Sequence, residues 1–160
     1  MKLTSDFSDL LRALNDAGAR YLVVGAHALA YHCRPRATAD LDVWVDSTRE
    51  NAPRVYRALA KFGAPLERLT INDLLSEDLI FQIGLAPLRI DIITGIDGVK
   101  FSDAWRRRVE DSIDGVRIRI IGRKDLIRNK RAAGRLKDLA DVASLERRPK
   151  VKAIKRKRRS

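Results

Sequence analysis

The sequence predicts a single α/β (α+β) domain in which a mixed β-sheet is flanked by helices. Short apolar, β-branched runs alternate along the chain with segments of helical periodicity, an order typical of this fold class. Two of the apolar runs are only four residues apart, which favours an antiparallel hairpin and therefore a mixed sheet. A chain of 160 residues is long enough for one hydrophobic core.

The first third of the chain predicts a helix, a strand and a second helix. Residues 7–17 place apolar side chains at helical spacing, and Gly18 follows where a C-terminal cap is expected. Residues 21–24 are apolar and mostly branched, which indicates a buried strand that ends at Gly25. Residues 26–31 then begin a helix.

A loop, a strand and a third helix are expected next. Residues 33–38 contain a proline, which ends the preceding helix. Residues 40–45 alternate with a period of two, which is typical of a half-buried strand. Ser47 and Glu50 have the spacing of a capping box, so we expect a helix to begin there and to end at Gly63.

The second half of the chain predicts three strands and two helices. Residues 79–83 and 88–93 form the expected antiparallel hairpin. Residues 116–121 alternate arginine with apolar side chains, as an edge or surface strand does. Residues 125–133 and 136–145 have helical periodicity and are separated by a glycine.

The positive charge of the chain is concentrated at its C-terminus. The net charge is +12, yet residues 147–160 hold nine lysines and arginines and no acid, which leaves residues 1–146 close to neutral. Such a segment repels itself and buries little, so we expect one folded domain over residues 1–146 and a disordered basic tail over residues 147–160. The tail either contacts nucleic-acid phosphates or only keeps the protein soluble.

The composition excludes several classes of protein. Cys33 is the only cysteine and cannot form an internal disulfide, and with His27 and His32 it offers too few ligands for a zinc site. No apolar run approaches the roughly 20 residues that cross a bilayer. The acidic, amphipathic N-terminus lacks the pattern of a secretory signal. We therefore expect a cytoplasmic protein with no membrane partner.

Two aspartates on one predicted strand are the first candidate site residues. Asp40 and Asp42 lie two positions apart and therefore point to the same face, while the apolar residues between and after them point to the other. Two neighbouring carboxylates repel each other and lose hydration unless a cation neutralises them. Mg²⁺ suits them because it prefers oxygen ligands and binds through one or two carboxylates plus substrate phosphates.

A third aspartate follows on the predicted hairpin. Asp91 alternates with Ile90 and Ile92, so it faces away from the apolar side of its strand. If this strand neighbours the one with Asp40 and Asp42, three carboxylates converge. Taken alone, an Asp-x-Asp pair is explained equally well by exposed acids on an edge strand.

The residues before the acidic strand strengthen the functional interpretation. Gly25 ends a strand and opens a helix, where free backbone N–H groups and the helix dipole favour a phosphate. Arg34 and Arg36 lie in the loop just before the acidic strand and can contact further phosphate oxygens. A phosphate-binding turn, a basic loop and metal-binding carboxylates in one short segment are together more specific than each alone.

A second basic segment combines a tryptophan with arginines. Trp105 is followed directly by three arginines, residues 106–108. An aromatic ring among arginines is typical of surfaces that bind nucleic acid. An amphipathic helix with a packed Trp105 and solvated arginines explains the same pattern equally well.

Residues 23–30 and 36–45 resemble the minimal nucleotidyltransferases of the DNA polymerase β superfamily. The signature of that family is a strand, a Gly-Gly or Gly-Ser turn at a helix start, an Asp-x-Asp strand and a third aspartate on a later strand. Asp91 matches the third aspartate. The chain departs from the family at Ala26, where serine or glycine is usual and where the serine hydroxyl helps to hold nucleotide phosphates.

A later segment resembles one branch of that superfamily. Lys130, Arg135 and Asp138 are similar to the Lys…Arg…Asp motif of the AbiEii toxin-like branch, and the whole resemblance covers roughly residues 5–146. It implies a nucleotidyltransferase-like fold and a transferase that moves a nucleoside monophosphate from an NTP such as ATP to an acceptor hydroxyl. The acceptor would belong to RNA, such as a tRNA end, or to a partner protein, and such enzymes often act in toxin–antitoxin pairs.

The resemblance also implies roles for individual residues. Asp40 and Asp42 would bridge two Mg²⁺ ions, for which Mn²⁺ can substitute, and Asp91 would complete the metal nearest the acceptor and help to deprotonate it. The nucleotide contacts would be Gly25, Ala26, Arg36, Lys130 and Arg135.

Two other functions fit the same residues. A nucleotide-binding or RNA-binding module that has kept the fold and lost turnover is favoured by Ala26. A metal-dependent nuclease also fits, because three acids and Mg²⁺ suit phosphodiester hydrolysis.

Overall fold

The computed structural model describes residues 1, 3–33, 40–85 and 88–147. The helices are α1 (Ser5–Asp16), α2 (Gly25–His32), α3 (Ala52–Phe62), α4 (Phe101–Arg106), α5 (Arg123–Ala133) and α6 (Leu136–Glu146), with a short 3₁₀-helix η1 at Asp73–Leu75. The strands are β1 (Tyr21–Val24), β2 (Leu41–Val45), β3 (Ile80–Ile83), β4 (Ile90–Ile93), β5 (Val109–Ile113) and β6 (Val116–Ile120).

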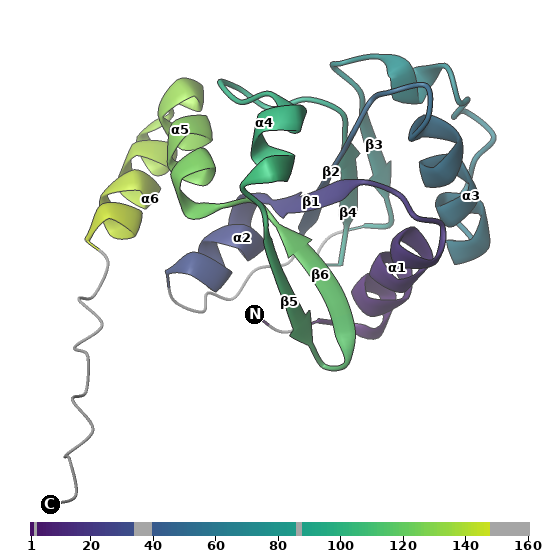
Figure 1. Ribbon diagram of the computed structural model, residues 1–160, viewed down its shortest axis with the longest axis horizontal. Helices are drawn as coiled ribbons and strands as arrows, with labels where there is room; N and C mark the ends of the chain where they lie inside the picture. Colours follow the sequence, from purple (N-terminus) through teal and green to yellow (C-terminus); the bar gives the residue numbers. More distant parts are fainter. Residues whose placement is uncertain (2, 34–39, 86–87, 148–160) are drawn as a thin grey trace, which may run out of the picture.

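The strands form one mixed six-stranded sheet in the order β3-β4-β2-β1-β6-β5. β2 runs parallel to β4 and antiparallel to β1, and β1 pairs in parallel with β6. The β3–β4 and β5–β6 pairs are antiparallel hairpins. The predicted α/β domain, with a mixed sheet flanked by helices, is therefore confirmed (Figure 1).

Helices gather at both ends of the sheet. Figure 1 shows α1 and α3 side by side at one end and the α5–α6 pair at the other, next to α2. The Tyr21 hydroxyl of β1 donates a hydrogen bond to Asn15 of α1 at 2.9 Å, which places α1 over the Tyr21 face of the sheet. On the other face, Phe101 of α4 packs against Trp44 of β2, with ring centroids 5.0 Å apart. The core is continuous through the central strands.

Most predicted elements are confirmed, and local chemistry explains their ends. The Thr4 side chain accepts a hydrogen bond from the Phe7 N–H and caps α1, whose apolar face is buried. Gly18 follows α1 with φ +66°, a left-handed conformation that glycine adopts most easily. Gly134 separates α5 from α6 in the same way, with φ +68°.

The predicted capping box at Ser47 and Glu50 is wrong, because α3 begins only after Asn51. The Asn51 side chain accepts a hydrogen bond from the Arg20 N–H at 2.7 Å and donates to the Asp46 carbonyl at 2.9 Å. These bonds hold the start of β1 against the end of β2. Because the strands fix Asn51, the helix starts at Ala52. Pro53 then lies in the first turn of the helix, where proline is well tolerated.

The sequence left open whether residues 116–121 form an edge or a surface strand, and the structure shows the second, with buried and more exposed residues alternating along β6. β6 lies between β1 and β5, and its alternation arises because one face is buried under α1 while Arg117 and Arg119 lie on the other. The edge strand beside β6 is β5, which the sequence did not reveal because its central residues are Glu110, Asp111 and Ser112. The interpretation of residues 103–108 as a helix is confirmed in part by α4, which ends at Arg106.

The remaining predictions concern a membrane span, the basic tail and the loop before the acidic strand. None of the described helices is both long and apolar enough to cross a membrane. Residues 148–160 of the basic tail lie outside the described residues, and so do residues 34–38 of the predicted loop, with Arg34 and Arg36.

Candidate active site

The turn from β1 into α2 contains the predicted phosphate-binding glycine. Gly25 has φ +65°, a conformation that L side chains rarely adopt. A Cβ atom at this position would overlap the Asp42 carboxylate, so the close approach of turn and acidic strand requires glycine. As the first helical turn has no internal partners for its N–H groups, α2 begins with free donors beside Asp42.

The predicted convergence of aspartates follows from strand order. β2 and β4 are parallel neighbours, and Asp42 and Asp91 are direct partners across them. Directly paired residues share a face of the sheet, and one such row holds Gln82, Asp91, Asp42 and Val24. We call this side of the sheet the carboxylate face. Asp40 lies just before β2, on the same face as Asp42.

Arg89 is a residue of this site that the sequence-based prediction did not include. Its Nη2 donates a hydrogen bond to Asp40 Oδ2 at 3.0 Å and another to Asp91 Oδ2 at 3.3 Å. Its Nε lies 3.0 Å from Asp91 Oδ1 but is not aligned for a hydrogen bond. Arg89 lies directly before β4 and two residues before Asp91, a spacing that puts both side chains on one face.

The electrostatics of the cluster centre on Asp42. Burial, and then the neighbouring charges of Asp91 and Asp40, raise the pKa of Asp42 to about 6, and Arg89 partly offsets them. A hydrogen bond between the carboxyls of Asp42 and Asp91 contributes in the same direction. Folding therefore brings together carboxylates whose mutual repulsion a bound cation would relieve.

The donor set fits Mg²⁺, although the side chains do not form a closed site as they stand. Across residues 1, 3–33, 40–85 and 88–147, no three His, Cys, Asp or Glu side chains are arranged to hold a metal ion, and Arg89 lies between two of the aspartates. Asp40 Oδ1 and Asp91 Oδ1 are buried without a hydrogen-bond partner in the described structure. Carboxylate oxygens are the ligands that Mg²⁺ prefers.

His27 contributes to packing beneath the turn. Its ring is buried and meets Phe7 of α1 edge to face, with centroids 5.4 Å apart. Burial lowers the pKa of His27, so the imidazole is neutral at physiological pH. This contact holds the first turn of α2 against α1, while the adjacent Ala26 is half-buried.

Lys130 and Arg135 form a separate cluster at the α5–α6 junction. Lys130 is buried, with its Nζ 3.0 Å from Asp141 and 3.7 Å from Asp138. Arg135 Nε lies 2.7 Å from Asp138, and this hydrogen bond is the main reason that the pKa of Asp138 is lowered. In the part of the chain that the structure describes, neither cation pairs with Asp40, Asp42 or Asp91.

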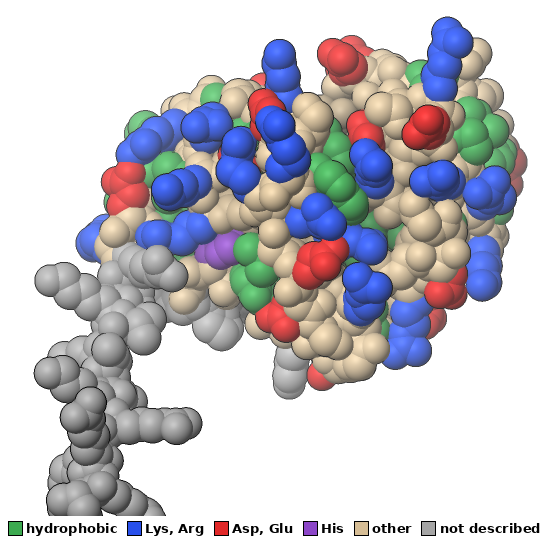
Figure 2. All heavy atoms as spheres, in the orientation of Figure 1, with side chains coloured by type: hydrophobic (Ala, Val, Ile, Leu, Met, Phe, Trp, Pro, Cys, Tyr) green, Lys and Arg blue, Asp and Glu red, His purple; other side chains and the backbone are tan. Residues whose placement is uncertain are grey.

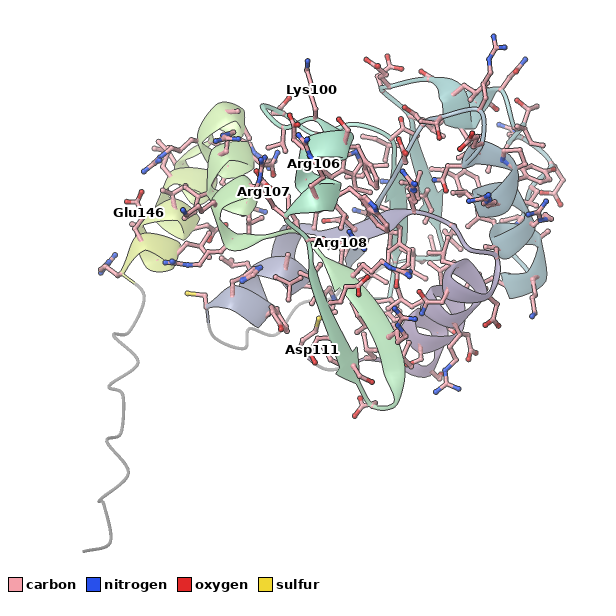
Figure 3. The ribbon with its side chains drawn as sticks, viewed as in Figure 1. Lys100, Arg106, Arg107, Arg108, Asp111 and Glu146 are labelled. Carbon is pink, nitrogen blue, oxygen red and sulfur yellow. The ribbon has the colours of Figure 1, made fainter. Side chains whose placement is uncertain are left out.

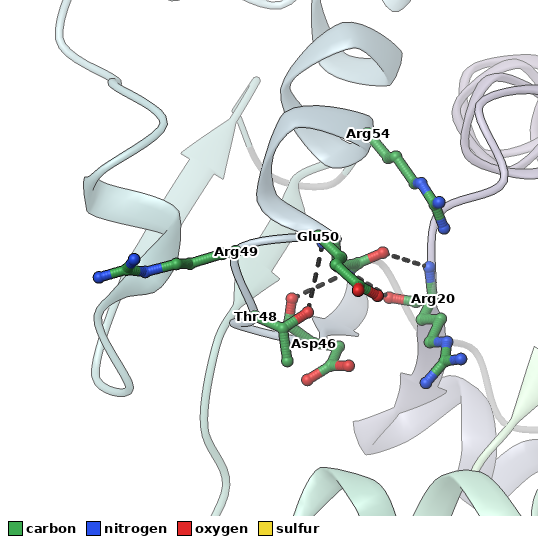
Figure 4. Close-up of a pocket in the computed structure, with 7 residues that line it drawn as sticks. Arg20, Asp46, Thr48, Arg49, Glu50 and Arg54 are labelled. Carbon is green, nitrogen blue, oxygen red and sulfur yellow. Dashed lines mark hydrogen bonds between the residues drawn. The ribbon is translucent and has the colours of Figure 1, made fainter.

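A polar pocket of about 300 Å³ lies at the opposite end of β2 (Figure 4). It is lined by Arg20, Asp46, Thr48, Arg49, Glu50, Asn51 and Arg54. Burial raises the pKa of Asp46, while Arg20 lowers it. The strand thus carries a half-buried carboxylate at each end, and only the Asp42 end meets the glycine turn and two further aspartates.

Comparisons with known proteins identify the fold. No family model matches the sequence, and no curated protein matches it. A candidate nucleotidyltransferase from Thermotoga maritima has a similar structure, with a TM-score of 0.54, 14% identity and coverage of 86% of each chain. An antigenic nucleotidyltransferase-like protein from Paracoccidioides brasiliensis gives a TM-score of 0.49 at 15% identity, over 89% of this chain and 77% of that one. At such identity the first similarity establishes a nucleotidyltransferase-like fold.

Proposed function

We propose that the protein is a Mg²⁺-dependent nucleotidyltransferase that moves a nucleoside monophosphate from an NTP to a hydroxyl of RNA or of a protein. One observation carries the proposal: Asp42 faces Asp91 across β2 and β4 and meets the Gly25 turn on its other side. Carboxylates for metal ions and N–H donors for phosphates thereby lie at one point, on a nucleotidyltransferase-like fold.

Each residue of the cluster has a role in the proposed reaction. Asp40 and Asp42 would hold the metal ions, and bound metal would supply stabilisation of the attacking and leaving oxygens of an in-line displacement. Asp91 would receive the proton of the acceptor hydroxyl. The oxygen of that hydroxyl forms a bond to the α-phosphorus, the bond to the β-phosphate oxygen breaks, and pyrophosphate leaves.

The geometry of the Gly25 turn supports the proposed phosphate contacts, and the family resemblance supports the contacts of Arg36, Lys130 and Arg135. The N–H groups that follow Gly25, at Ala26 and beyond, would donate hydrogen bonds to the β- and γ-phosphates. Arg135, whose side chain is 70% exposed, contacts the nucleotide together with Arg36, and Lys130 positions Arg135 through the Asp138 that both cations share. A toxin-like role with a cognate antitoxin rests on the resemblance of Lys130, Arg135 and Asp138 alone.

A second candidate is a nucleotide-binding module without turnover. The Arg89 guanidinium already neutralises Asp40 and Asp91, and Ala26 lacks the hydroxyl of the usual serine. In this alternative Arg89 stays in place and the carboxylates never bind metal.

Incubation with α-³²P-labelled NTPs, Mg²⁺ and total RNA distinguishes these functions. Label transferred to RNA or to protein supports the proposal, NTP binding without transfer supports the module, and shortened RNA supports a nuclease. Asp42→Asn and Asp91→Asn should each abolish transfer. Asp46→Asn is the matched control, because it removes a half-buried carboxylate from the far end of the same strand. Equal activity of Asp42→Asn and Asp46→Asn would overturn the site assignment.

A further inference from the structure

Trp105 of α4 lies among three arginines from different parts of the chain. The guanidinium of Arg108 lies over the indole ring, 4.0 Å from its centroid, and those of Arg20 and Arg119 lie 5.6 Å away. On its inner side Phe101 stacks against Trp105, with centroids 5.8 Å apart and planes 19° from parallel. The ring is therefore fixed in place. The Arg108 side chain lies against it and is 28% exposed, whereas the Arg119 side chain is 18% exposed and also donates a hydrogen bond to Asn15.

The arginines around Trp105 exceed the acids that they contact. Glu110 lies within 3.2 Å of both Arg108 and Arg119 and 3.8 Å from Arg117. One carboxylate thus faces three guanidinium groups, and Arg117 is 69% exposed. We call Arg20, Trp105, Arg108, Arg117 and Arg119 the arginine–tryptophan surface. Figure 2 shows basic side chains around α4 and the start of the β5–β6 hairpin. Figure 3 labels Arg108 near that start, whereas Arg107 lies toward α5, where it pairs with Asp125.

This surface lies on the carboxylate face of the sheet. Val23 of β1 pairs with Ile120 of β6, so Arg119 lies beside Leu22. Leu22 in turn pairs with Trp44 of β2, which is two residues beyond Asp42. Arg119 is therefore two strands and two residues from Asp42, a backbone separation on the order of 12 Å. The rings of Trp44, Phe101 and Trp105 form a continuous series between the two regions.

We infer that the arginine–tryptophan surface binds single-stranded RNA and holds it as the acceptor beside the carboxylate cluster. Arginines neutralise phosphates without regard to sequence, and the guanidinium over Trp105 offers a plane on which an unpaired base can stack. A duplex would have no free base for this plane. An acidic protein would match the charge but would bring no base to stack on this plane. The acceptor role rests on the proposed transferase activity, whereas the binding does not.

The test measures RNA binding in the absence of nucleotide and metal. A fluorescein-labelled single-stranded RNA without stable hairpins is titrated with full-length protein in EDTA, and anisotropy is followed over a range of salt concentrations. Arg108→Gln/Arg117→Gln should weaken binding roughly tenfold at low salt and reduce the salt slope by about 1.4, because each phosphate contact on a single strand contributes about 0.7. Arg12→Gln/Arg57→Gln is the control, since it removes the same charge from exposed positions of α1 and α3.

The outcomes separate this inference from the proposed chemistry. Binding of the Arg108/Arg117 variant equal to that of the control would overturn the surface assignment, as would equal affinity for duplex RNA. Tighter binding of an acidic peptide than of RNA would also overturn it. Asp42→Asn should bind RNA like the parent, so loss of transfer with intact binding would count against the catalytic site alone. Trp105→Phe should weaken binding less than the arginine variant, since it keeps the charges.

Discussion

Gly25 and Asp42 are so closely packed that a single methyl group on Gly25 would overlap the Asp42 carboxylate. The turn at Gly25 and the acidic strand are therefore fixed relative to each other by direct contact. The same contact makes the geometry of the site sensitive to the smallest possible substitution.

Gly25→Ala should lower both stability and nucleotide binding. The left-handed backbone costs about 1–2 kcal/mol for alanine, and the overlap with Asp42 adds about 1–3 kcal/mol. Gly18→Ala separates these effects, because Gly18 has φ +66° and open space where its Cβ would lie. Thermal unfolding and NTP titration of both variants provide the measurement. Equal loss of stability in the two variants would show that contact with Asp42 is unimportant.

Asp42→Asn should change how the stability of metal-free protein depends on pH. The carboxyl has an ordinary pKa of 3.8 and a folded pKa of about 6, so between these values the folded state holds more protons than the unfolded state. The free energy of unfolding therefore falls as the pH rises from about 4 through 6. In EDTA, Asp42→Asn should be more stable than the parent at pH 7.5, by roughly 1–3 kcal/mol, and similar to it near pH 4.

Denaturant unfolding at several pH values checks this expectation. Asp9→Asn, an exposed carboxyl on α1, is the control and should follow the parent curve. A variant that loses stability at pH 7.5 would mean that the Asp42 charge is well compensated in the fold, contrary to the crowding described above.

Arg89→Gln should tighten metal binding while weakening the metal-free fold. The guanidinium contacts Asp40 and Asp91, so a divalent cation must compete with it for their oxygens. Removing it should increase Mn²⁺ affinity roughly tenfold and destabilise the metal-free protein by about 1–3 kcal/mol, because the carboxylates lose a hydrogen-bonded partner. Titration calorimetry and the Mn²⁺ spin-resonance signal report the affinity. Unchanged affinity, as expected for the control Arg106→Gln, would mean that Arg89 and the metal do not compete.

Deleting residues 147–160 should weaken RNA binding and flatten its salt dependence, without changing the transfer rate at saturating acceptor. Nine positive charges can contact phosphates with little sequence preference, and none belongs to the carboxylate cluster. Salt titrations of full-length and truncated protein are compared. Equal slopes would identify the tail as a solubilising end.

The sequence was most informative where strand periodicity and chemistry coincide. The alternation around Asp42 and Asp91 predicted their shared face, and the short hairpin predicted the pairing of β3 with β4. The neighbour relation of β2 and β4 could not be predicted, because strand order depends on packing far along the chain. β5 was missed since an exposed edge strand needs little apolar periodicity, as Glu110 and Asp111 illustrate.

Interactions between side chains of different elements were also beyond the sequence. Nothing in the order of residues reveals that Arg89 reaches Asp40, or that Lys130 is buried against Asp141 rather than exposed for a nucleotide. Likewise, the use of Asn51 to join β1 and β2 displaced the start of α3 from its predicted capping box.

The position of β1 in the middle of the sheet has a consequence for how the chain folds. β1 pairs with β2 after a short excursion of the chain, whereas its pairing with β6 at Val23 and Ile120 closes a loop several times longer. Longer loops cost more entropy to close and slow the contacts that depend on them. The strands that carry the carboxylates should therefore assemble first, and the β5–β6 hairpin should dock last, bringing Arg117 and Arg119 with it. Pulse-labelled amide exchange would then show protection of β1 and β2 before β6, and simultaneous protection would contradict this order.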